Sequence, residues 1–159
     1  MSSKLRVEFG LPQHGWISFN IICGDSDFSI CASYTPYDSV GALTSAICQI
    51  AKGIPEVMVP WNEEPVEHEL HFKGDAALTS FTITSHPDHS RIQGTGQQAF
   101  EAHGSRLDIC LAFWRALRRL ESSLKASDFE RAWGHPFPTE KLEELTQLMQ
   151  RMKAREVEG

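Results

Sequence analysis

The sequence has no apolar run near the roughly 20 residues that a membrane-spanning helix requires. Its first residues, MSSKLRVEFG, lack the hydrophobic segment of a signal peptide. Cysteine is sparse, and the copies lie far apart inside apolar patterns, which is typical of reduced thiols rather than of a disulfide framework (Cys23, Cys31, Cys48 and Cys110). These absences predict a cytoplasmic protein with buried thiols and no membrane contact.

Motifs of common catalytic sites are absent too. The sequence has no GxSxG, and no cysteine lies in a glycine-rich or helix-start context that would activate its thiol. Gly94-Thr95-Gly96 lacks the lysine and the following helix of a phosphate-binding loop. The segment His68-Glu69-Leu70-His71 is not the zinc-binding HExxH motif, because its histidines lie on a predicted strand and would point to opposite faces. We therefore expect no catalytic residue, metal or cofactor.

The polar stretch 85–96 keeps one chemical alternative open. A loop containing His86, Asp88 and His89 could bring two imidazoles and a carboxylate together around an ion. No third histidine and no cysteine lies near them in the sequence. A small enzyme or a ligand- or metal-binding domain that uses the His86–His89 loop, or His68, is thus the alternative to a non-enzymatic function.

Basic residues are outnumbered, because 15 lysines and arginines face 21 aspartates and glutamates for a formal charge of −6. An acidic surface of this kind argues against a general affinity for nucleic acid. The imbalance is local, since residues 54–90 hold seven acids and one base. We therefore expect no nucleic-acid partner and place electrostatic recognition in this middle segment.

Residues 27–53, DFSICASYTPYDSVGALTSAICQIAKG, predict a strand, a turn and a helix in succession. Apolar and polar residues alternate in the first part, as on a half-buried strand, and Pro36 ends that pattern. Asp38 or Ser39 can cap the helix that follows, in which apolar residues recur every three or four positions. Gly53 can adopt the left-handed conformation that ends a helix. This unit is expected to form part of the core.

Outside this unit, apolar and polar residues alternate with a period of two before residue 104. After residue 104 the apolar residues recur at helical spacing. The sequence predicts one α+β domain over residues 1–159, with an antiparallel sheet of about six strands, one inserted helix, and a helical C-terminal third packed on one face. The predicted strands are 5–9, 16–23, 27–34, 64–72, 78–84 and 97–103, with a loop or short edge strand over 54–61, an exposed loop over 85–96, and C-terminal helices over 105–125, 127–133 and from 138 onward.

One face of the predicted strand 64–72 is a candidate docking surface. Glu67 and Glu69 would project from the same face, near Trp61 and the Glu63-Glu64 pair. Carboxylates around an aromatic side chain suit a basic protein, because charge steers association and the aromatic supplies an anchor. We therefore predict that Trp61, Glu63, Glu64, Glu67 and Glu69 bind a partner.

Two other surfaces are alternatives for protein contact. The predicted helix 105–125 carries arginines on its outer side, which could contact an acidic partner, a second subunit or the acidic strand of the same domain. Trp114 or Trp133 could support a homodimer.

The layout of short strands around SYTPYDSVGALTSAI and WNEEPVEHELHF, followed by the helix LDICLAFWRALRRLE, resembles a loose group of small bacterial proteins. Some of these are immunity proteins encoded beside polymorphic or contact-dependent toxins. The resemblance covers most of the chain, and its one local marker is the W-x-x-E-P of Trp61, Glu64 and Pro65. It implies a small acidic inhibitor that covers the active surface of a cognate toxin without turnover. Together with the acidic middle segment, it predicts that this toxin is basic.

Overall fold

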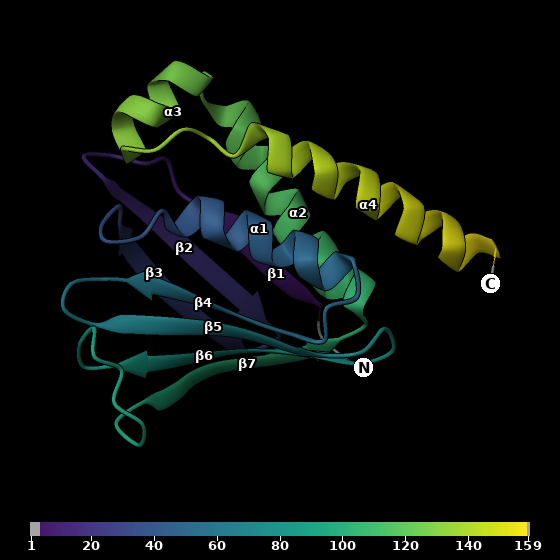
Figure 1. The fold of residues 1–159 in the computed structure, drawn as a ribbon, viewed down its shortest axis with the longest axis horizontal. Coiled ribbons are helices and arrows are strands. Elements are labelled where there is room, and N and C mark those ends of the chain that lie inside the picture. The colour runs from purple at the N-terminus through teal and green to yellow at the C-terminus, as the bar shows by residue number, and fades with distance from the viewer. Residues whose placement is uncertain (1–3, 159) are drawn as a thin grey trace.

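The computed structural model describes residues 4–158. Within this range the chain forms seven strands and four helices, so the predicted α+β class is confirmed (Figure 1). In chain order the elements are β1 (Leu5–Phe9), β2 (Trp16–Cys23), β3 (Ser26–Ser33), α1 (Ser39–Ala51), β4 (Glu56–Asn62), β5 (Glu67–Gly74), β6 (Thr79–His86), β7 (Gln97–Gly104), α2 (Arg106–Ser123), α3 (Ala126–Trp133) and α4 (Thr139–Glu158).

The strands form two antiparallel sheets, so the prediction of one sheet with about six strands is wrong. One sheet has the order β1-β2-β3 and the other the order β4-β5-β6-β7. The helix α1 separates β3 from β4 in the chain, and these two strands are not paired by a hydrogen-bonded ladder. β4 lies at one edge of its sheet, where a strand tolerates a proline such as Pro60. The segment 54–61 is therefore confirmed as containing an edge strand.

The strand–turn–helix unit of residues 27–53 forms as predicted. Asp38 is the N-cap of α1, and its Oδ1 accepts a hydrogen bond from the backbone N–H of Gly41 at 3.2 Å. The same oxygen accepts a hydrogen bond from the indole Nε1–H of Trp133 at 2.9 Å. Gly53, just past the helix, has a φ of +104°, which glycine adopts without a side-chain clash. Asp38 thus both starts α1 and connects it to α3.

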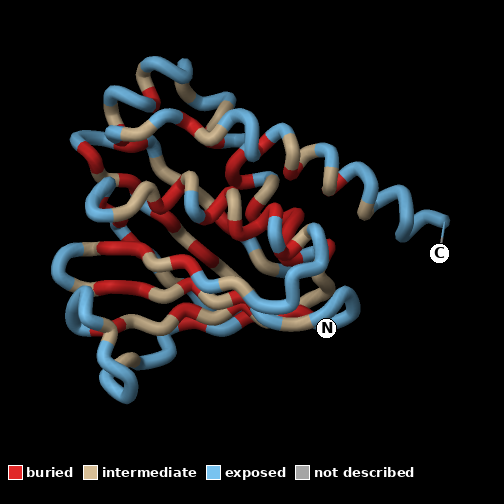
Figure 2. The backbone as a smooth tube through the Cα atoms, in the orientation of Figure 1, coloured by how far each residue is buried: buried red, intermediate tan, exposed pale blue. Residues whose placement is uncertain are grey.

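The inner faces of both sheets and one face of α2 enclose the core (Figure 2). Phe113 of α2 contacts both sheets, with ring centroids 6.4 Å from Phe19 and 5.1 Å from Phe81. Trp61 of β4 lies 4.7 Å from Phe19 and is 0% exposed. The two sheets are therefore held together by aromatic packing around α2, and Trp61 belongs to this core.

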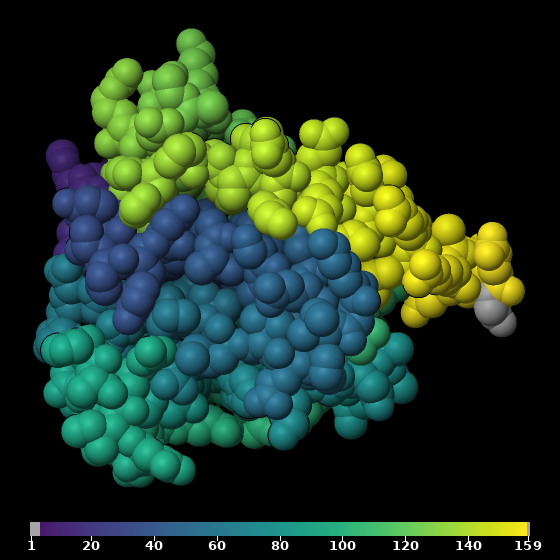
Figure 3. Space-filling model, in the orientation of Figure 1, coloured from purple at the N-terminus to yellow at the C-terminus, as the bar shows by residue number. Residues whose placement is uncertain are grey.

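The outer face of the four-stranded sheet remains largely exposed. In Figure 1 the helices lie above the strands of this sheet, and in the space-filling view its residues form the lower, teal part of the surface (Figures 1 and 3). Met58 on this face is 43% exposed. Among the described residues, no helix has the length and apolar character to cross a membrane.

Two local predictions need correction. β6 continues through Ser85 and His86, which were assigned to an exposed loop, and His86 is buried. Pro87 follows directly, so the turn begins two residues later than its polar sequence suggested. Of the cysteines expected to be buried, Cys48 and Cys110 are, whereas Cys31 is exposed on the outer side of β3.

Candidate functional site at the start of β5

The site is built on two successive cross-strand pairs. In the β5–β6 ladder, Glu67 lies opposite His86 and His68 lies opposite Ser85. Side chains alternate between the faces of a strand, so His68 and Ser85 point inward while Glu67 and His86 point to the outer face. The start of β5 therefore carries a polar pair on each face of the sheet.

On the inner face, His68 makes two short hydrogen bonds. Its Nδ1 lies 2.8 Å from Ser85 Oγ and its Nε2 lies 2.7 Å from Glu63 Oε1. The His68 side chain is 4% exposed, and the ring of Phe28 meets it edge-on with centroids 5.6 Å apart. Glu63 Oε2 also accepts a long 3.4 Å hydrogen bond from the backbone N–H of Cys31. We call Glu63, His68 and Ser85 the triad.

With an ionised carboxylate at Glu63 and a neutral imidazole at His68, each hydrogen bond of the triad has one direction. An ionised carboxylate only accepts, so Nε2 of His68 donates to Glu63. In a neutral imidazole the other nitrogen is then an acceptor, and the hydroxyl of Ser85 donates to Nδ1. The order hydroxyl, imidazole, carboxylate is that of serine hydrolases, with the two ring nitrogens exchanged. Chemically, this arrangement can withdraw the proton of Ser85.

The connection between β4 and β5 is fastened to the first sheet. Glu64 Oε1 accepts hydrogen bonds from Ser33 Oγ at 3.2 Å and from Thr35 Oγ1 at 3.3 Å. Asn62 Nδ2 donates to the backbone oxygen of Thr35 at 2.6 Å. These bonds hold the segment that carries Glu63 and thereby position its carboxylate for His68.

On the outer face, Glu67 is 0% exposed, and neither of its carboxyl oxygens has a hydrogen-bond partner among the described residues. His86 is buried too, and its ring nitrogens are also without a hydrogen bond in that range. Its Nε2 lies 3.4 Å from Glu69 Oε1, which is a charge contact with poor hydrogen-bond alignment. Unsatisfied buried groups of this kind are rare in folded proteins.

Burial raises the pKa of Glu67 above its usual range, and the nearby charge of Glu69 adds to the rise. The Tyr37 hydroxyl, Arg91 and His89 act in the opposite direction. The pKa of Tyr37 is raised by its own desolvation and by Glu67. The hydroxyl is thus close to the carboxyl, although its geometry does not qualify as a hydrogen bond. The environment of Glu67 favours its protonated form.

The β6–β7 connection covers this outer-face pair. A Cβ on Gly96 would lie 2.6 Å from His86 Cε1, so the loop approaches the imidazole at a distance that only glycine allows. Arg91, in the same loop, places Nη1 3.8 Å from Glu69 Oε1 and 3.9 Å from Met58 Sδ. The loop therefore covers His86, while Glu67 is buried beside Tyr37 of the β3–α1 connection and near Arg91 of this loop.

The structure does not bring the predicted partner-binding residues onto one surface. Trp61 and Glu67 are fully buried and point to opposite faces of the sheet, which corrects the expectation of an exposed aromatic beside projecting carboxylates. Glu63 and Glu64 lie in the β4–β5 connection, engaged by His68 and by β3. Glu69 remains partly accessible, with 28% of its side chain exposed. Whether these residues bind a partner stays a prediction.

The structure also shows where the histidines of the metal alternative and the tryptophans of the predicted homodimer surface lie. His86 is buried on β6 whereas His89 is exposed on the loop, and within residues 4–158 no three His, Cys, Asp or Glu side chains gather as a metal site would require. Trp133 is 0% exposed, so it offers no surface to a second subunit. Trp114 is half-buried and donates its indole hydrogen bond to Thr146 at 2.9 Å.

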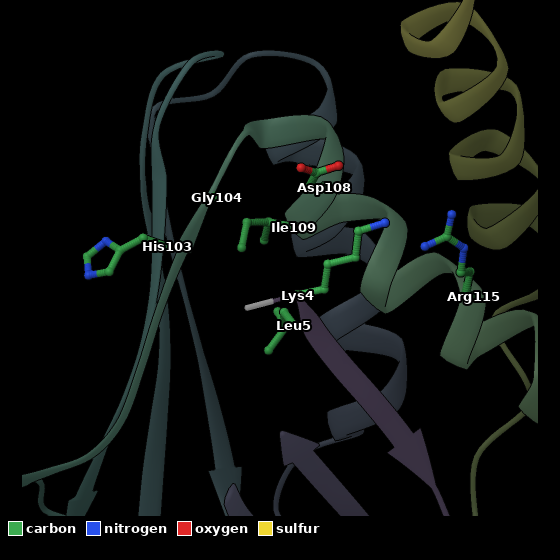
Figure 4. A pocket seen from close by; sticks show the side chains of 7 residues that line it. All are labelled: Lys4, Leu5, His103, Gly104, Asp108, Ile109 and Arg115. Atoms are coloured by element: carbon green, nitrogen blue, oxygen red, sulfur yellow. The ribbon is translucent and has the colours of Figure 1, made fainter. Parts of the chain in front are cut away.

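The arginines of α2 are partly used within the chain. Arg119 Nη2 donates to the backbone oxygen of Val7 in β1 at 2.8 Å, and Arg118 lies 3.7 Å from Glu121 on its own helix. Between the start of β1, the end of β7 and α2 lies a hollow of about 160 Å³ (Figure 4). Figure 4 shows His103 pointing away from it. Ligand pockets usually measure roughly 300–1,000 Å³, so this hollow is too small for most organic ligands.

No family model, no curated protein and no solved structure matches the chain. The resemblance to immunity proteins therefore remains a prediction. The sequence pattern identified the face on which His68 lies but missed Ser85, because Ser-His-Pro was interpreted as a loop. A signal for that residue was present, since Phe81, Ile83 and Ser85 continue the inward period of β6.

Proposed function

We propose that the chain is a protein-binding inhibitor of the immunity type, which holds a basic toxin domain against the outer face of its four-stranded sheet. The distribution of charge carries this proposal. Residues 56–104, which contain β4 to β7, hold eight acids and two bases, a net charge of −6 that equals the formal charge of the whole chain. The negative potential therefore originates from this sheet and its loops.

Glu56 and Glu101 are accessible carboxylates of this face, and among the described residues neither has an ion pair with a lysine or arginine, whereas Glu69 lies 3.8 Å from Arg91. The Glu56 side chain is 52% exposed and that of Glu101 is 46% exposed. Each has a histidine as its nearest partner, and a neutral imidazole donates a hydrogen bond without cancelling the charge. The pairs on this face are Glu56–His71 at 2.8 Å, Glu69–His86 at 3.4 Å and Glu101–His103 at 2.7 Å.

Inhibition would follow from occlusion, with no chemical step. The acidic face accelerates encounter with a basic partner, and the exposed Met58 and Ile92 supply apolar contact beside it. Glu69 belongs to this face with 28% of its side chain exposed, and Glu64 is exposed in the β4–β5 connection. Trp61 lies on the inner face of the sheet, and Glu67 is buried on the outer face. A sheet is a rigid platform, so little ordering entropy opposes such a complex.

Charge reversal tests the proposal against the product of the neighbouring open reading frame, which the proposal expects to be a basic protein. We expect Glu56→Lys with Glu101→Lys to weaken binding by about tenfold or more in calorimetry at low salt, because both charges lie on the proposed interface. The matched control is Glu130→Lys with Glu143→Lys, two exposed positions on α3 and α4. Equal affinities for the two double variants, or no complex with the parent protein, would overturn the proposal.

A further inference from the structure

The triad lies on the other side of the sheet from the proposed docking face. His68 and Ser85 point toward the inner space between the sheets, at the end where Phe28 of β3 is half-buried. Ser85 itself is only partly buried. A chemical function here would be independent of partner binding.

We propose that Ser85 is a nucleophile that accepts acyl groups, with His68 as its general base and Glu63 as the residue that orients His68. The contacts allow this assignment, because the Ser85 hydroxyl can donate to Nδ1 of His68 in the tautomer whose Nε2–H donates to Glu63. Both distances, 2.8 and 2.7 Å, are within the reach that proton transfer needs.

One further contact supports the assignment. The carboxylate is also anchored independently, by the Cys31 backbone N–H, so it is held in place for His68.

The reaction is an ordinary acyl transfer. Ser85 Oγ adds to the carbonyl carbon while its proton passes to His68 Nδ1, and the adduct expels the alcohol, which takes that proton. Water then attacks the acyl-serine ester, again giving a proton to His68, and the acid leaves with Ser85 regenerated. The bond formed to Ser85 is broken in the second half, and no other reactant is needed.

The surroundings indicate the class of substrate. The edge of Phe28 beside His68 favours an apolar acyl or alcohol group. The Glu63 carboxylate, 35% exposed, opposes anionic substrates. Neutral or cationic esters with a short acyl chain are therefore the proposed class of substrate.

Labelling with a fluorophosphonate, followed by peptide mass spectrometry, tests the assignment on the full chain. We expect one adduct on Ser85, slow hydrolysis of p-nitrophenyl acetate, and loss of both in Ser85→Ala. Ser80→Ala, on the same strand but the outer face, is the matched control and should keep both. His68→Gln should slow labelling by about 100-fold, the usual contribution of a general base.

Glu63 acts through His68, so its role is tested by comparing the labelling rates of a neutral variant and a shorter acidic variant. Glu63→Gln should slow labelling, and Glu63→Asp should restore part of the rate, with thermal unfolding used to confirm that each variant is folded. A folded parent protein that stays unlabelled, or a Ser85→Ala variant that labels as fast as the parent, would overturn the proposal. The docking proposal would be unaffected by either result.

Discussion

Glu67 lies opposite His86 in the β5–β6 ladder, yet both side chains are buried without a hydrogen bond between them. A carboxyl group without a donor is costly to ionise in an apolar environment. The ionisation of the buried Glu67 therefore opposes folding. The free energy of unfolding should depend on whether this carboxyl group is protonated.

Glu67→Gln should stabilise the protein at neutral pH by about 1 kcal/mol or more, because it removes a buried group that resists ionisation. The raised pKa of Glu67 means that the folded state binds this proton more tightly than the unfolded state does. The stability that the protonated Glu67 contributes is thus complete at acid pH. It is lost as the pH rises through the pKa that Glu67 has in the folded state. The advantage of the variant should therefore grow from pH 4 to pH 8 in urea unfolding.

The comparison for that variant is Glu69→Gln, two residues along the same face and partly exposed. It should change the free energy of unfolding by only about 0.5 kcal/mol, as expected for exposed ion pairs. A Glu67→Gln protein that is less stable than its parent at pH 8 would show that the buried carboxyl has a favourable partner.

Trp61→Ala should destabilise the fold by about 3–5 kcal/mol, since it removes a fully buried aromatic packed against Phe19. Trp114→Ala, at a half-buried helix position, should cost clearly less. Guanidinium unfolding of the two variants measures the difference. If Trp61→Ala keeps full stability while losing partner binding, the indole is a surface anchor and its place in the core is incorrect.

Asp38→Ala should cost about 2–3 kcal/mol, because one oxygen both caps α1 and accepts the indole hydrogen bond of Trp133. Asp38→Asn keeps an acceptor at the same position and should retain most of the stability. The thermal midpoints of the two variants provide the test. Equal losses would mean that the negative charge, not the acceptor, is what matters at the start of α1.

The exposed and the buried cysteines should differ in their rates of alkylation. Cys31 is exposed and should react within minutes with iodoacetamide at pH 8. Burial raises the pKa of Cys110 to about 12, so its thiolate is scarce and its sulfur inaccessible in the folded protein. Peptide mass spectrometry should find Cys110 modified only after denaturation. Rapid native labelling of Cys110 would contradict the packing of α2.

Local features of the sequence predicted most elements of this fold. The alternation of apolar and polar residues predicted β5, with His68, Leu70 and Phe72 on one face. Asp38 and Gly53 predicted the limits of α1. Alternation does not reveal what covers a face, however. Glu67 occurs in a pattern typical of a solvent-facing strand, yet it is buried beside Tyr37 and near Arg91, two residues distant from it in the sequence.

Local sequence patterns likewise do not predict that the strands divide into two sheets. The residues of β3 and β4 carry no mark of whether they pair, and pairing depends on how α1 and α2 pack between distant segments. The triad shows the same limit, because the register of β5 and β6 brings His68 to Ser85, and the path of the β4–β5 connection brings Glu63 to His68. Residue types were visible in the sequence, but their distances were not.

A hydrogen-exchange footprint of the complex with the proposed basic toxin domain tests the docking proposal most directly. We predict protection on the partner-facing strands β4 to β7 and in the loop 87–96, with α2, α3 and α4 unchanged. That result would locate the interface on the acidic sheet. Protection concentrated on the arginines of α2 instead, with the sheet unchanged, would contradict the account.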